Sequence, residues 1–110
     1  MQILKFEKKG VTVLAVNGQI DVHTSPKLRL EFEKLYDQGV RKMVIDFEKV
    51  TYVDSSGLAT LIYMLQQLRQ NNGAMALANL LDKINNLFTL TKIDMLMSIY
   101  QTQEEAITSL

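Results

Sequence analysis

The residues in this chain whose types and order could support chemistry lie at positions 54 to 57. Asp54, Ser55 and Ser56 follow a β-type run, and a helical pattern begins at about Gly57. The start of a helix leaves free main-chain N–H groups and the positive end of the helix dipole, and both favour a negative oxygen or a phosphate. A serine at such a place can cap the helix, act as a nucleophile or accept a phosphoryl group.

Each of these roles makes a different demand on the rest of the chain. A cap role for Asp54 or Ser55 needs no partner residue and would contribute about 1 kcal/mol. A serine hydrolase needs a histidine base, and the one histidine is His23, with Asp21 or Asp46 as orienting acid; neither serine stands in a Gly-x-Ser-x-Gly elbow. A phosphate cradle is disfavoured because the segment has one glycine and no lysine. A phosphorylation site requires no missing residue.

A second polar junction runs from Gly18 to Thr24 and connects an opening pair of strands to the first helix. Its simplest interpretation is a turn in which Asp21 and Thr24 make local hydrogen bonds. On this interpretation His23 is a loop or packing residue and not a metal ligand.

The hydrophobic pattern predicts the elements that must position the two junctions. Alternating and β-branched runs predict strands over 2–7, 11–16, 43–47, 74–78 and 96–100, and apolar residues three and four apart predict helices over 26–39, 58–69, 82–90 and 102–110. Gly18 is expected to break the second strand, and Thr24, Asp82 and Thr102 to cap helices. The fold class is therefore α/β, a mixed, mostly parallel five-stranded sheet with about four helices packed on it.

Composition excludes several kinds of protein. The chain has 110 residues, 47% of them hydrophobic, which suits a single domain over 1–110. Lysine plus arginine and aspartate plus glutamate both number 12, so no overall charge attracts nucleic acid. Without cysteine and with a single histidine, the sequence predicts no metal site and no cofactor. No segment is long and apolar enough for membrane insertion, and the expected location is cytoplasmic.

At both junctions the sequence resembles the STAS domain, and in particular the bacterial anti-sigma-factor antagonists. The similarity lies in Gly18-Gln19-Ile20-Asp21 and in Val53-Asp54-Ser55-Ser56-Gly57-Leu58. The resemblance implies that Ser55 is phosphorylated, with Ser56 as the neighbouring alternative, and that Asp54 orients the serine or contacts a partner. The docking surface that it implies contains Asp21, His23, Thr24, Ser25, Asp54, Ser56 and Gly57.

In that family the unphosphorylated protein binds an anti-sigma factor that is also a serine kinase, and a sigma factor is released; a phosphatase reverses the modification. The resemblance thus implies a kinase substrate and not an enzyme. Phosphate beside Asp54 would add about −1.5 to −2 charges and weaken binding, while the helix start would favour the anion by roughly 0.3–1 kcal/mol and keep the domain folded. The alternative is a STAS subunit of a larger transport or stress-sensing assembly without a phosphoserine switch.

Overall fold

A five-stranded mixed sheet forms the centre of the computed structural model, which describes residues 1–110. The strands are β1 (Gln2–Lys8), β2 (Val11–Ile20), β3 (Lys42–Val53), β4 (Ala74–Ala78) and β5 (Ser98–Tyr100). They lie in the sheet in chain order; β1 is antiparallel to β2, and every later neighbour is parallel. This arrangement confirms the predicted α/β class with a mostly parallel sheet.

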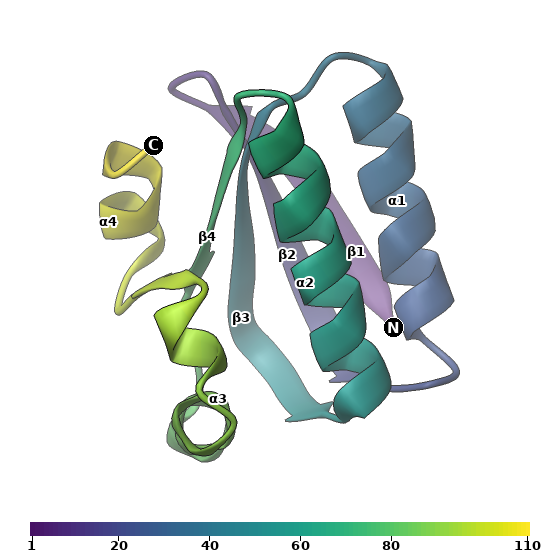
Figure 1. Ribbon diagram of the computed structural model, residues 1–110, viewed down its shortest axis with the longest axis vertical. Helices are drawn as coiled ribbons and strands as arrows, with labels where there is room; N and C mark the ends of the chain where they lie inside the picture. The colour runs from purple at the N-terminus through teal and green to yellow at the C-terminus, as the bar shows by residue number, and fades with distance from the viewer.

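Helices cover the two faces of the sheet unequally. The helices are α1 (Ser25–Asp37), α2 (Ser55–Gln70), α3 (Asp82–Leu90), the short 3₁₀ turn η1 (Ile93–Met95) and α4 (Gln103–Thr108). The first three pack their apolar stripes on one face, where a core of 20 buried residues includes Phe32, Phe47 and Phe88. Figure 1 shows α1 and α2 side by side across the strands, with α4 set apart from them. No helix has the length and apolar character needed to cross a membrane.

The opposite face of the sheet is only partly covered. There α4 buries Ala106 and Ile107 against a smaller cluster of strand residues that includes Val13 and Val44. The β1 end of this face carries Leu4, whose exposed fraction is 66%. The two layers of helices therefore leave part of the β1–β2 surface open.

Several details differ from the sequence-based expectations. The strand β2 continues through Gly18 to Ile20, because Gly18 takes a positive φ of 119° beside a shift in the β2–β3 register, which glycine tolerates. The hydroxyl of Thr24 does not cap α1, and Asp82 is the first residue of α3 instead of its cap. The last strand begins only at Ser98.

Two other details bear on the helix caps and on the site. Thr102 caps α4 as expected, since its hydroxyl accepts from the Glu105 N–H at 3.1 Å. The strand β3 is longer than expected and runs to Val53. It therefore leads straight into Asp54 and the serines.

Candidate functional site

The start of α2 is fixed by the side chain of Asp54. This residue has an extended backbone, and its Oδ1 accepts from the N–H groups of Ser56 at 2.9 Å and Gly57 at 3.1 Å. The Asp54 carbonyl oxygen also accepts from the Leu58 N–H at 3.0 Å. The capping interpretation of the sequence is thus confirmed for Asp54, whereas Ser55 is the first residue of the helix.

The turn between β2 and α1 is organised by Asp21. Its Oδ1 accepts from the N–H groups of His23 at 2.9 Å and Thr24 at 3.0 Å, and the Thr24 Oγ1 accepts from the Asp21 N–H at 2.9 Å. The Thr24 hydroxyl in turn donates to the Gln19 carbonyl at 2.6 Å. Partial burial alone would raise the pKa of Asp21, but the hydrogen bonds from Thr24 and His23 outweigh it and hold that pKa below its ordinary value.

These two junctions lie next to each other because β2 and β3 are parallel neighbours that end together. Ile20 is paired with Val53 in the register, so the residues that follow both strands emerge at the same edge of the sheet. The second oxygen of Asp54, Oδ2, accepts from the Val22 N–H at 3.3 Å, and the Asp54 N–H donates to the Ile20 carbonyl at 3.2 Å. One carboxylate therefore connects the β2–α1 turn to the first turn of α2.

Gly57 is required by how closely α2 approaches the strands. A Cβ atom at this position would lie 2.5 Å from the Ile20 carbonyl oxygen and 2.9 Å from a methyl carbon of Val53. Both distances are shorter than real Cβ contacts. The glycine thus allows the helix to start directly against β2 and β3, which sets the position of Ser55.

The residues predicted for the site fall into an outer and an inner group. Ser55 and His23 are exposed, and Asp21, Thr24, Asp54 and Ser56 are half-buried. Ser25, with an exposed fraction of 6%, and Gly57 lie beneath them in the interior. The structure therefore brings both junctions together into one surface, with Ser25 and Gly57 supporting it from below.

Two exposed apolar side chains near this surface were missed by sequence reasoning. Val22 is 59% exposed and Tyr52 is 49% exposed. A signal was present in the sequence, because Val22 is a large apolar residue inside a polar junction and Tyr52 stands two residues before the other junction. We name the outer group together with these two residues the junction surface: Asp21, Val22, His23, Thr24, Tyr52, Asp54, Ser55 and Ser56.

The geometry does not assemble the parts of a serine hydrolase. Asp46 lies on the other face of the sheet, 5% exposed, where its carboxylate accepts from Gln103 at 2.7 Å and from the Glu48 N–H at 2.9 Å. Asp21 accepts from the main chain of His23, and no hydrogen bond joins the imidazole to either serine. No three side chains of metal-binding type converge anywhere in the chain. What the site offers chemically is an exposed hydroxyl.

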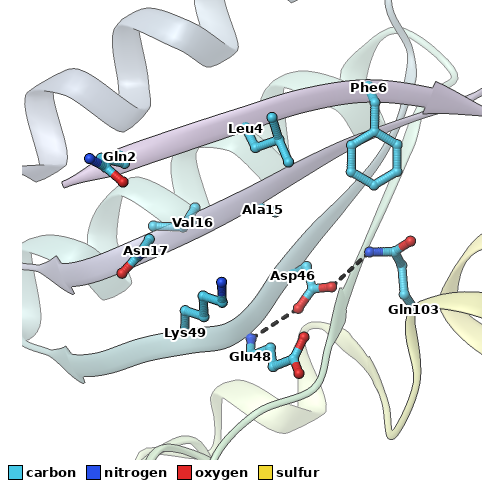
Figure 2. Close-up of a pocket in the computed structure, with 10 residues that line it drawn as sticks. All are labelled: Gln2, Leu4, Phe6, Ala15, Val16, Asn17, Asp46, Glu48, Lys49 and Gln103. Carbon is cyan, nitrogen blue, oxygen red and sulfur yellow. Dashed lines mark hydrogen bonds between the residues drawn. The ribbon is translucent and has the colours of Figure 1, made fainter.

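A separate hollow of about 470 Å³ surrounds Asp46 on the partly open face of the sheet. Figure 2 shows Asp46 between β3 and Gln103 at the start of α4, with Leu4 and Phe6 of β1 along another side. Asn79 also donates to both oxygens of Asp46 at 3.2 Å. The Asp46 carboxylate thus accepts four hydrogen bonds, which use its acceptor sites. Because Gln103 belongs to α4 and Asn79 follows β4, these bonds hold both segments against the sheet.

Fold and site together define a class of protein: an α/β domain that presents a serine at the start of a helix, set beside a neighbouring turn by an aspartate. The model of the STAS domain family matches residues 2–106. The chain therefore belongs to the STAS domain family, which confirms the resemblance seen in its two motifs.

Curated relatives and solved structures agree with this assignment. The chain is 32% identical over 89 residues to the anti-sigma-B factor antagonist of Staphylococcus aureus, which covers 81% of this chain and 82% of that protein. An anti-sigma factor antagonist from Mycobacterium paratuberculosis superposes with a TM-score of 0.89 at 26% identity, over 98% of this chain and 92% of the other. The phosphorylated form of the Bacillus cell fate determinant SpoIIAA has a TM-score of 0.75 at 23% identity and covers 98% of each chain.

Proposed function

We propose that this protein is an anti-sigma factor antagonist whose binding to an anti-sigma factor is switched by phosphorylation of Ser55. The observation that carries the proposal is the exposed Ser55 at the first position of α2, beside a turn that the Asp54 carboxylate holds in place. The antagonist names of the relatives support the choice of partner. SpoIIAA, which shares the fold, has been solved both without and with its phosphate.

The junction surface, with Ser55 unphosphorylated, is suited to protein binding. Val22, whose N–H donates to Asp54, and Tyr52, three residues before Ser55, offer exposed apolar area, and contacts of this kind form the desolvated centre of an interface. The turn that carries Val22 is held by hydrogen bonds from main-chain N–H groups to the Asp54 and Asp21 carboxylates, and Tyr52 lies in the strand β3, so little conformational entropy is lost when a partner docks. A partner that covers this surface must bury the Ser55 hydroxyl.

Phosphorylation would oppose that burial for an electrostatic reason. A phosphoserine carries about −1.5 to −2 charges at neutral pH, and desolvating it in an interface is unfavourable without a cation to pair with it. Asp54 adds a further negative charge within one residue. We infer that the partner is an anti-sigma factor with serine kinase activity, that modification ends its sequestration, and that a phosphoserine phosphatase restores binding in the cytoplasm.

The test is a phosphorylation reaction with matched serine variants. The protein is incubated with ATP and the anti-sigma kinase of its own organism, and mass spectrometry locates the phosphate. We expect one phosphate on Ser55, none in Ser55→Ala, and normal modification of Ser56→Ala. A STAS subunit without a switch would remain unmodified, and modification of Ser56 alone would reject the assignment of the acceptor.

Binding is then measured by calorimetry with the same anti-sigma factor. Ser55→Asp should bind at least about tenfold more weakly than the wild type, the equivalent of about 1.4 kcal/mol, because one added charge must be desolvated. Its circular dichroism spectrum and Tm should stay close to those of the wild type, since Ser55 is exposed. Unfolding of this variant, or unchanged affinity, would contradict a switch that acts at the surface.

A further inference from the structure

The first turn of α2 has few main-chain donors left for a phosphate. A helix start normally offers free N–H groups to an anion. In this protein the N–H groups of Ser56 and Gly57 already donate to the Asp54 carboxylate, and the Leu58 N–H donates to the Asp54 carbonyl. The Ser55 hydroxyl therefore lies beside a helix start where the N–H groups of Ser56, Gly57 and Leu58 already donate to the preceding residue.

The Asp54 side chain is held too firmly to give way easily. Its Oδ1 bonds to two N–H groups of α2 and its Oδ2 to the Val22 N–H, while its main-chain N–H donates to Ile20. Displacing this carboxylate would uncap α2 and also release the turn that holds Val22. To displace it, a phosphate would have to replace three accepted hydrogen bonds at once.

We propose that Asp54 is a positioning residue that keeps a phosphate on Ser55 off the start of α2 and leaves the anion facing outward. This inference rests on the proposed function and deepens it. Were the donors free, the phosphate could fold back onto the N–H groups of Ser56 and Gly57 and lose part of its effect on a partner. With Asp54 in place, the phosphate stays in solvent, and the negative charges of both groups face an approaching protein.

The experiment needs no kinase, because phosphoserine can be incorporated genetically at position 55. It is placed in the wild type, in Asp54→Asn and in Asp54→Gly. Asparagine caps a helix about as well as aspartate but without the charge, and glycine removes the side chain that bonds to Ser56, Gly57 and Val22 at a position where helices tolerate glycine. Amide resonances are compared with and without the phosphate by ¹H–¹⁵N NMR, and the phosphate is titrated by ³¹P NMR.

In the wild type and in Asp54→Asn, the Ser56 and Gly57 amide protons should not move downfield when the phosphate is present. In Asp54→Gly they should, because the phosphate then accepts from them. The pKa of the phosphoserine should also be lower in Asp54→Gly than in Asp54→Asn by about 0.2–0.7, the size of a helix-end effect.

Two results would overturn the inference: downfield shifts of these amides in the phosphorylated wild type, or no downfield shift in phosphorylated Asp54→Gly. The proposed function fails by a separate result. If the phosphorylated wild type bound its anti-sigma factor as tightly as the unmodified protein, the switch would be rejected, whatever the amide shifts showed.

Discussion

Replacing Gly57 with alanine tests how closely α2 must approach the sheet to place Ser55. At an unobstructed helical position this substitution stabilises a protein by up to about 1 kcal/mol, because glycine is a poor helix former. At Gly57 the new Cβ would lie 2.5 Å from the Ile20 carbonyl oxygen and 2.9 Å from carbon atoms of Ile20 and Val53. The expected sign of the effect is therefore reversed.

The size of the effect follows from what the alanine would contact. The Ile20 oxygen belongs to the main chain of β2 and accepts from the Asp54 N–H at 3.2 Å, so it cannot move without disturbing the N-cap. Overpacking of this kind costs about 1–3 kcal/mol. We expect a net loss of about 2 kcal/mol, which corresponds to a fall in Tm of about 8 °C or more for a chain of this size.

The assay is urea and thermal unfolding followed by far-ultraviolet circular dichroism. The control is Ala59→Gly, two residues further along α2 at an exposed position, which should lose only about 1 kcal/mol through helix propensity. If Gly57→Ala were as stable as the wild type, or more stable, α2 would not lie this close to β2, and the structural reason given for the glycine would be wrong.

Further predictions concern Asp46, Asp21 and the proposed acceptor Ser55. Asp46→Ala should destabilise the protein by about 2–3 kcal/mol in urea unfolding and speed amide exchange in α4, because the amides of Gln103 and Asn79 lose their acceptor. If amide exchange in α4 were unchanged, the Asp46 carboxylate would not be what holds this helix on the sheet. Asp21→Asn should be less stable than the wild type at neutral pH. Because folding lowers the pKa of Asp21, its stabilising effect is present above the ordinary value of 3.8 and disappears as the pH falls through the lower folded value. A difference in unfolding free energy between the wild type and Asp21→Asn that persisted in acid would refute this. Ser55→Ala should leave the Tm unchanged, since Asp54 provides the cap; a clear fall would mean that the hydroxyl supports the fold.

The elements could be predicted from the sequence wherever they follow a local hydrophobic period. Residues such as Leu61, Leu65 and Leu68 repeat at helical spacing and are buried in α2, and the apolar run from Met43 to Phe47 lies in the sheet. Irregular positions were harder to predict from the sequence. A glycine at position 18 gives the same local signal whether it ends a strand or carries it through a register shift, and the pairing with β3 decides between the two.

The site divides in the same way between local and long-range information. The sequence by itself determined that Asp54 and the serines stand at a strand-to-helix junction, because capping depends on neighbours two and three residues away. It could not show that Val22 contacts Asp54, which lies 32 residues later in the chain. Nor could it show that Asp46 lies on the opposite face of the sheet beside Gln103, which is 57 residues later. Those contacts depend on which strands pair and in what register, and many residues distant in sequence decide that together. The tertiary structure alone therefore made two separate polar junctions into one surface around Ser55.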